Sequence, residues 1–316
     1  MRTEYTLALP CCPMEALPLP DTSMPTSPMR LPAAQRALRR ALAFLLLLLA
    51  TSLAGAGESG SLHIATYNLR LDVASDGANA WPHRREAVKA LVQRHGFDLF
   101  GTQEALPRQL ADLDALAGYA RVGVGRDDGK QAGEHSAIFY RRDRFELLAH
   151  GDFWFSQTPE VPSKGWDARC CNRLASWARL RDKASGKALT VVSVHFDHEG
   201  EVARRESAAL LLRWLAGRDP GDALVALGDF NSSPETEQIR RMQAVMGDAR
   251  LRSEAPPYGP EGTFNGFAMG QPPGPRIDYI FVGPRIRVLD YAVLTDSDGQ
   301  RYPSDHFPVT ARLRLE

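Results

Sequence analysis

The sequence predicts an α/β fold in which two mixed, mainly antiparallel sheets pack face to face and helices cover the outside. Strand-like runs and helix-like periods occur together along the chain, but they do not alternate strictly as in a doubly wound parallel sheet. The neighbouring runs 134–141 and 145–155 look like antiparallel partners. No linker, repeat or low-complexity tract follows residue 60, so we expect one domain over residues 57–316.

The expected strands are short apolar runs, and several of them end in polar residues. In chain order they are SLHIATYNLR, FDLFGTQE, EHSAIFYRR, ALTVVSVHFDH, DALVALGDFN and RIDYIFVG, with a last strand after SDH. Four of these runs end near Asn68, Glu104, His195 and Asp229. Because binding groups usually lie at strand ends and in loops, we expect these ends to converge in one cleft.

Three helices are expected between these strands. Val88 and Leu91 share one face of the segment WPHRREAVKALVQRHG, which stops at Gly96. Residues 104–118 and 201–217 repeat apolar residues at spacings of three and four, and each segment also stops at a glycine. These periods are typical of amphipathic helices that cover a sheet.

Residues 1–56 are expected to lie outside the fold. Four arginines precede a short apolar run at Ala41–Ala50, and Ala54, Gly55 and Ala56 resemble a signal-peptide cleavage site. The alternative is a transmembrane anchor, but the apolar run is too short to span a bilayer comfortably. We therefore expect an exported protein, periplasmic or secreted, that keeps no stable membrane anchor after cleavage. Met29 would be the true start of translation.

Charge and cysteine content limit the classes of function. Removing residues 1–56 leaves 33 basic and 35 acidic residues, a formal charge of −2, which disfavours strong sequence-independent binding of duplex nucleic acid. This charge is compatible with a phosphate-ester substrate. Cys11 and Cys12 fall in the N-terminal segment, whereas Cys170 and Cys171 could form a vicinal disulfide or remain two thiols. The spacing of the cysteines does not suit a zinc site.

The polar residues at the strand ends favour a hard metal ion. They offer oxygen ligands and imidazoles without a Cys/His cluster, so zinc or iron is poorly supported. Mg²⁺ or Mn²⁺ prefers oxygen ligands, and either ion can neutralise phosphoryl oxygens. The candidate residues are Asn68, Glu104, His195, Asp229, Asn231, Asp278, Asp305 and His306.

The ordered series TYNLR, TQE, SVHFDH, GDFN, RIDYIF and SDH resembles the endonuclease/exonuclease/phosphatase superfamily over residues 61–316. This superfamily includes pancreatic-type deoxyribonucleases, abasic-site endonucleases, inositol polyphosphate 5-phosphatases and bacterial sphingomyelinases. The resemblance implies a four-layer α/β sandwich and metal-dependent hydrolysis of phosphoesters. The loops resemble those of poorly characterised exported members and not those of the DNA-repair branch.

The resemblance assigns Asn68, Glu104 and Asp305 to the metal site. Considered alone, Asn68 is typical of a turn after a strand, and Glu104 of an acid that a helix N-terminus favours. The two interpretations of Glu104 are compatible, because a helix-terminal acid can also bind a metal.

Asp229 resembles the aspartate that orients or deprotonates the attacking water, and Asn231 resembles the group that binds the phosphate or the nucleophile. Considered alone, the GDFN segment is typical of an ordinary turn. Within the ordered series, the catalytic interpretation is favoured.

Each of two histidines is assigned an acidic partner by the same resemblance. His195 would contact the phosphate, and Glu134 would orient it and raise the pKa of its imidazole. His306 resembles the principal catalytic histidine, and its partner Asp278 would be costly to bury unpaired. Asp305 and His306 are adjacent because one short segment can present both side chains to one small site.

Three further residues are weaker candidates for substrate contacts: Tyr140, His198 and Arg204. Tyr140 is better suited to the core, and Arg204 suits a solvated helix face at least as well as a phosphate site. The aromatic segment 152–180 could form a wall of the site.

The expected function is Mg²⁺- or Mn²⁺-dependent hydrolysis of a phosphodiester, in nucleic acid or in a small molecule, by a monomer. Water activated by Asp229 would attack phosphorus, and His195 and His306 would stabilise the added negative charge without a covalent intermediate. Two alternatives stay open. One is a non-catalytic member that binds a phosphate ligand, and the other is a phosphatase of the sphingomyelinase or inositol-phosphate type instead of a nuclease.

Overall fold

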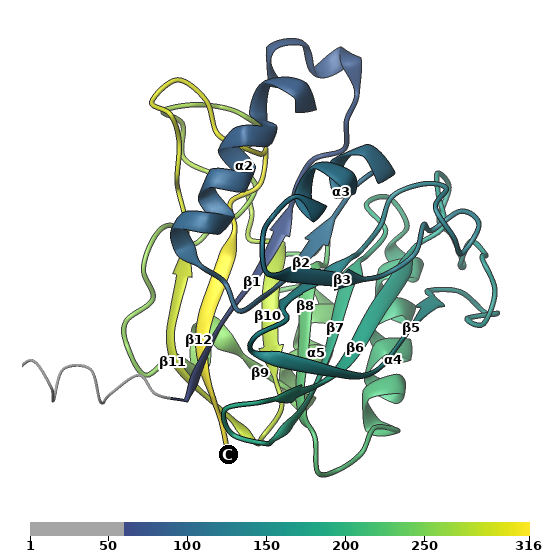
Figure 1. Cartoon of the computed structure of the whole chain (residues 1–316). Helices are drawn as coiled ribbons and strands as arrows, with labels where there is room; N and C mark the ends of the chain where they lie inside the picture. The colour runs from purple at the N-terminus through teal and green to yellow at the C-terminus, as the bar shows by residue number, and fades with distance from the viewer. Residues whose placement is uncertain (1–59) are drawn as a thin grey trace, which may run out of the picture. The chain divides into compact units, whose positions relative to one another are not determined.

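The computed structural model describes residues 60–316, which form two six-stranded sheets packed face to face (Figure 1). Helices pack on the outer face of each sheet, so the predicted fold class is confirmed. The predicted signal peptide, its cleavage site, the start at Met29, the domain boundary and Cys11 and Cys12 lie outside the described residues.

The first sheet has the strand order β11-β12-β1-β2-β4-β3. Within it, β1 and β2 are parallel, and the other neighbouring pairs are antiparallel. Its strands are β1 (Ser61–Asn68), β2 (Leu99–Gln103), β3 (Tyr119–Val122), β4 (Ile138–Arg141), β11 (Ile286–Val293) and β12 (Val309–Leu315).

The second sheet has the strand order β5-β6-β7-β8-β10-β9. Here β7 and β8 form the parallel pair, so each sheet contains one parallel pair near its centre. Its strands are β5 (Phe145–Trp154), β6 (Leu174–Asp182), β7 (Ala188–His195), β8 (Ala223–Asp229), β9 (Gly247–Asp248) and β10 (Asp278–Val282).

The three expected helices form, and additional short helices accompany them. The helices are the 3₁₀ helix η1 (Ala74–Asn79), α2 (Trp81–His95), α3 (Pro107–Asp114), α4 (Glu201–Ala216), α5 (Glu237–Val245) and α6 (Ala249–Arg252). α2 ends where Gly96 adopts a left-handed conformation (φ 60°), which a glycine reaches without steric cost. Within residues 60–316, none of the helices combines the length and the apolar character needed to cross a membrane.

Three apolar layers hold the sandwich together. Because successive side chains of a strand point to opposite faces, Ile64 of β1 packs between the sheets and Tyr67 packs under α2 and α3. In the same way, Val191 of β7 lies between the sheets and Val192 lies under α4 and α5. Apolar burial on both faces of the central strands therefore fixes the register that positions their polar ends.

The runs 134–141 and 145–155 do not pair with each other, contrary to the prediction. β4 lies in the first sheet beside β2 and β3, whereas β5 pairs with β6 in the second sheet. The turn between β4 and β5 carries the chain from one sheet to the other, and Arg144 anchors it by donating to Asp182. Within the aromatic segment 152–180, Trp154 ends β5 and Leu174 begins β6, so residues 155–173 connect the two strands.

Candidate active site

The strand register gathers polar residues at the carboxyl ends of the two parallel pairs. In the second sheet, His195 of β7 lies opposite Asp229 of β8, which lies opposite Asp278 of β10. In the first sheet, Asn68 ends β1 where β2 also ends, and Glu104 follows β2. The carboxyl ends of parallel strands are where open α/β sheets bind ligands.

A cavity of about 640 Å³ lies at these strand ends. Eight of the twelve predicted site residues line it. Asn68 and Asp278 do not line the cavity, but each makes a side-chain contact with a residue that does. Tyr140 and Arg204 are the two predicted site residues that the structure leaves outside this group.

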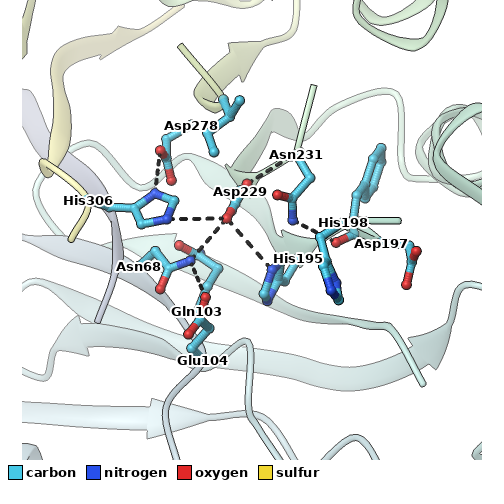
Figure 2. A network of polar contacts seen from close by, with 12 residues as sticks. Asn68, Gln103, Glu104, His195, Asp197, His198, Asp229, Asn231, Asp278 and His306 are labelled. Carbon is cyan, nitrogen blue, oxygen red and sulfur yellow. Dashed lines mark hydrogen bonds and ion pairs between the residues drawn. The ribbon is translucent and has the colours of Figure 1, made fainter. Parts of the chain in front are cut away.

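Asp229 lies at the centre of the polar network (Figure 2). Its Oδ2 accepts a hydrogen bond from Asn68 Nδ2 at 3.0 Å and lies 3.7 Å from His195 Nε2 and 3.9 Å from His306 Nε2. Its Oδ1 accepts from the backbone N–H of Asn231 at 2.8 Å. Burial, reinforced by the nearby charge of Asp278, raises the pKa of Asp229 to about 7.

His306 contacts Asp278, as expected, with 2.9 Å between Nδ1 and Oδ2. Thr263 Oγ1 donates to the same carboxylate oxygen at 2.6 Å. Burial alone would lower the pKa of His306, but the charge and the hydrogen bond of Asp278 outweigh it and raise this pKa to about 10. The imidazole is therefore a cation at neutral pH, and it faces Asp229.

His195 does not have the environment that the sequence predicted. Glu134 lies 3.7 Å from its Nδ1, but the carboxylate is closer to Arg126, whose Nη1 is 2.6 Å away. Burial and then the charges of Arg173 and Arg126 lower the pKa of His195 well below its usual value. The expected rise in this pKa is therefore wrong, because burial of the ring, followed by the charges of the two arginines, lowers it.

Arg173 supplies the cation beside His195. Its side chain is buried, with Nε 3.3 Å from Asp197 Oδ2, Nη1 3.2 Å from the ring nitrogens of His195, and Nη2 2.6 Å from Nδ1 of His198. A guanidinium only donates hydrogen bonds, so only the unprotonated one of the two ring nitrogens of His195 can accept from Arg173. His198 is thus tied to the cavity wall through Arg173.

Asn68 acts as a hydrogen-bond donor between two carboxylates. Its Nδ2 donates to Glu104 Oε1 and to Asp229 Oδ2, both at 3.0 Å, while its Oδ1 accepts from the backbone N–H of Arg70 at 3.0 Å. Glu104 also accepts from the backbone N–H of Leu71 at 3.0 Å. Asn68 therefore links the two sheets and fixes the spacing of Glu104 and Asp229.

Backbone strain is concentrated around this site. Five residues other than glycine have positive φ in residues 60–316, and three of them belong to the site: Arg70 at 55°, Glu104 at 62° and Asn231 at 44°. Such conformations are costly for residues with a Cβ, and they persist where the surrounding contacts enforce them. The strand ends are thus held in the shape that turns Glu104 and Asn231 toward the cavity.

Tyr140 and Arg204 are placed away from the cavity. Tyr140 is buried between the sheets among aliphatic side chains, where apolar packing accounts for it. Arg204 lies on α4 and donates to the carbonyl oxygen of Asp197 at 3.2 Å, so it supports the loop that carries Asp197. Neither position supports the predicted substrate contact.

The sequence reasoning missed three arginines and an aromatic residue of the cavity wall. Arg70, Arg126 and Arg173 line it, as does Phe264, which is 37% exposed and meets the ring of His306 edge-on at 5.1 Å. The sequence could have indicated a cation at the position of Arg173, because the acid Asp197 in the SVHFDH motif had no assigned partner. Cys170 and Cys171, also in the wall, form a vicinal disulfide.

The family model described as "Endonuclease/Exonuclease/phosphatase family" matches residues 65–306. The chain belongs to this family. The predicted resemblance is therefore confirmed, and membership together with the acidic and histidine groups around Asp229 supports a phosphoesterase.

Several solved structures are similar to this chain. A mannosyl-6-phosphatase from Bacteroides thetaiotaomicron is 42% identical, with a TM-score of 0.77 over 80% of this chain and 100% of that chain. A protein of unknown function from Enterococcus faecalis is 34% identical, with a TM-score of 0.76 over 81% of this chain and 100% of that chain. The catalytic domain of human Nocturnin is 18% identical, with a TM-score of 0.65 over 81% of this chain and 94% of that chain, and it shares the fold.

Curated relatives match more distantly. Nocturnin from Drosophila melanogaster is 24% identical over 284 residues, which is 75% of this chain and 42% of that protein. Two uncharacterised mimivirus proteins are each 27% identical over 173 and 168 residues, 44% and 48% of this chain. The chain spans between 25% and 59% of the length of these three relatives.

Proposed function

We propose that the protein is a divalent-metal-dependent phosphatase that hydrolyses a phosphate monoester of a small hydroxylated molecule, with a sugar phosphate as the first candidate. The observation that carries the proposal is the division of the cavity around Asp229. Glu104 and Asp305 lie with Arg70 on one side, and Arg126, Arg173 and His195 lie with Glu134 on the other. Such a site can bind a metal ion and a doubly charged phosphate next to each other.

The size of the cavity supports a small substrate. About 640 Å³ is within the range of pockets that enclose a small molecule, and it does not suit a nucleic-acid duplex. The similar Bacteroides protein is a mannosyl-6-phosphatase at 42% identity over its whole chain, which supports a hexose phosphate. Phosphodiester hydrolysis, the expectation from the sequence, becomes the alternative that the experiment below must exclude.

The side chains present fit a divalent cation. Glu104, His195 and Asp229 each offer one ligand atom, and these atoms lie within 4.8 Å of one another. The cation nearest Glu104 and Asp305 is Arg70, which stays 4.0 Å and 3.9 Å from their oxygens. Glu104 and Asp305 are therefore the residues that would hold the ion, and Asp229 beside them stays free to act on water. When bound, the ion would neutralise negative charge on the phosphoryl oxygens.

The protein groups would perform the remaining steps of hydrolysis. Asp229, with a pKa of about 7, can accept a proton from a water molecule at neutral pH. The protonated His306 would stabilise charge that develops on the phosphoryl group, and Asp278 would hold its ring in place. His195 is kept neutral, so it would contribute a hydrogen bond, and the positive charge on its side would come from Arg173.

The decisive experiment compares substrates on the full-length protein with Mg²⁺, Mn²⁺ or EDTA. Mannose 6-phosphate, glucose 6-phosphate, bis-p-nitrophenyl phosphate and an oligonucleotide would be offered side by side, with Asp229→Asn and a surface variant, Arg141→Ala, as controls. We expect metal-dependent release of inorganic phosphate from a sugar phosphate, lowered at least about 1000-fold by Asp229→Asn. Faster cleavage of the diesters would favour the alternative. No metal-dependent turnover of any substrate would favour a non-catalytic member.

We also propose that the protein is exported, on the strength of the signal-like segment before residue 57. Cell fractionation and N-terminal sequencing of the recovered protein would test export. A protein that stays cytoplasmic with residues 29–56 attached would contradict this proposal without affecting the proposed reaction.

A further inference from the structure

Arg126 lies in the loop between β3 and β4 and has a position fixed by its backbone. Its carbonyl oxygen accepts hydrogen bonds from Trp154 Nε1 at 2.7 Å and from Asn172 Nδ2 at 3.2 Å. Its backbone N–H donates to the carbonyl oxygen of Glu134 at 3.0 Å. The backbone of Arg126 is therefore held in place by three segments of the chain, independently of its guanidinium.

The guanidinium of Arg126 is nearly buried but only partly satisfied. Its side chain is 13% exposed, and Nη1 lies 2.6 Å from Glu134. Its Nε makes no hydrogen bond to any of residues 60–316, although Asp127 lies 3.8 Å away. Arg173, in contrast, uses all three of its nitrogens on Asp197, His195 and His198. Of the two, Arg126 has the greater capacity left to donate to a ligand.

Arg126 and Arg173 act on the same place in the cavity. Both line it, and the charges of both lower the pKa of His195, which lies 3.7 Å from Asp229. A phosphoryl group close enough to Asp229 to be attacked would present its remaining oxygens to this side of the cavity. Two guanidinium groups here offer hydrogen-bond donors to the phosphoryl oxygens, although each of them is already paired with one carboxylate, Glu134 or Asp197.

We propose that Arg126 determines specificity for a terminal phosphate by binding the third phosphoryl oxygen, which a diester carries as an ester. This inference rests on the proposed phosphatase function and names the residue that enforces it. A monoester has three terminal oxygens and nearly two negative charges at neutral pH. A diester has one charge, and its second alcohol group would lie against Arg126, where it would displace a charge-assisted hydrogen bond to the phosphate that the ion pair with Glu134 does not replace.

The test compares a monoester with its own methyl diester, so that the leaving alcohol is the same in both substrates. The substrates are mannose 6-phosphate and methyl mannose-6-phosphodiester, with Mg²⁺, on the full-length protein. We expect Arg126→Ala to lower kcat/KM for the monoester about 100-fold and that for the diester less than about fivefold. The preference for the monoester therefore falls at least about 20-fold. Arg126→Lys keeps the positive charge but not the planar guanidinium, and we expect a loss of kcat/KM for the monoester between that of Arg126→Ala and none.

Two further variants keep the outcome interpretable. Arg126→Ala leaves Glu134 buried without its partner and risks misfolding, so the double variant Arg126→Ala with Glu134→Gln is measured as well. Arg141→Ala removes an exposed arginine of β4 and is the matched control, for which we expect no change in preference. Equal losses on the two substrates in the folded variants would overturn the role of Arg126 while leaving the phosphatase intact. A wild-type enzyme that cleaves only the diester would overturn both proposals.

Discussion

At the scale of single residues, Asp278 controls the orientation and charge of His306. The carboxylate contacts Nδ1 at 2.9 Å and is itself held by Thr263. We expect Asp278→Asn to lower kcat about 10- to 100-fold, as losses of a supporting carboxylate do in comparable sites, with a smaller change in KM. Steady-state kinetics on the preferred phosphomonoester measure this. An unchanged kcat would show that His306 needs no partner for its role.

His63, on β1 and far from the cavity, makes the stability depend on pH. Burial, and then the charge of Arg312, lowers the pKa of His63 in the folded protein. Between this lowered pKa and the usual value near 6.5, the unfolded chain binds a proton that the folded chain does not. The free energy of unfolding therefore falls as pH decreases below about 6.5, by at most about 1.4 kcal/mol per pH unit for one group.

We therefore expect His63→Gln to reduce the loss of stability between pH 6.5 and pH 5. Urea unfolding at these two pH values gives the required comparison. His135, whose pKa burial also lowers, continues to contribute, so the dependence becomes weaker without disappearing. An identical pH dependence in the variant and the parent protein would contradict this assignment.

The motif residues could be predicted because each stands at a strand end in an ordered series. Asp229 and Asp278 meet as the register of β8 and β10 requires, and His306 reaches both from the segment before β12. Arg126 and Arg173 could not be predicted in this way, because arginine is common in loops and no spacing marks one that is buried. Their environments depend on pairing with acids that only the folded chain brings close. The predicted direction of the pKa shift of His195 was wrong because neither the burial of its ring nor these arginines could be foreseen.

At the scale of secondary structure, the contact of β7 with β8 depends on a glycine. Gly228 has φ 147°, and a Cβ at this position would lie 2.0 Å from the carbonyl oxygen of Val194. We expect Gly228→Ala to lower the free energy of unfolding by about 2–4 kcal/mol through strain and overpacking. Activity should fall as well, because Asp229 is the next residue.

Gly217→Ala at the end of α4 is the matched control. A Cβ there would be no closer than 3.5 Å to the nearest atom, and we expect little loss of stability. Thermal unfolding of both variants checks the pair. Similar melting temperatures for the two variants would show that β7 moves freely to accommodate a methyl group.

The elements that the sequence predicted well are those with a clear apolar period. β1, β7 and α4 are buried along a face, and their positions followed from that pattern. β6 was not predicted from the sequence, because tryptophan and arginine interrupt the alternation of apolar and polar residues along it and the cysteine pair precedes it. The prediction that the runs 134–141 and 145–155 pair with each other was wrong. Closeness along the chain constrains strand pairing less than the need of each strand for a partner within its own sheet, and β5 finds that partner in β6.

At the scale of the whole molecule, the carboxylates around the cavity couple metal binding to stability. Burial raises the pKa of both Asp229 and Asp305, which shows that the fold holds these charges at a cost. A divalent cation at about 100 times its Kd would stabilise the fold by about 2.7 kcal/mol, which raises the melting temperature by roughly 5–10 °C.

Scanning calorimetry with Mg²⁺ and with EDTA measures this shift. We expect Glu104→Gln to reduce it, since the variant loses one of the two carboxylates that would hold the ion. Equal melting temperatures with metal and with chelator would contradict a metal site at Glu104 and Asp305.

The central place of the last strand has a consequence for biosynthesis. β12 fills the gap between β11 and β1, with Arg314 opposite Ser61, and the segment that carries Asp305 and His306 comes directly before it. One edge of β1 therefore stays unpaired on the ribosome until residues 309–315 have emerged, which takes about 10–50 seconds after β1 at usual rates of elongation. A nascent chain is thus inactive and exposes an unpaired strand edge until β12 is made, which makes it a client for chaperones during that interval.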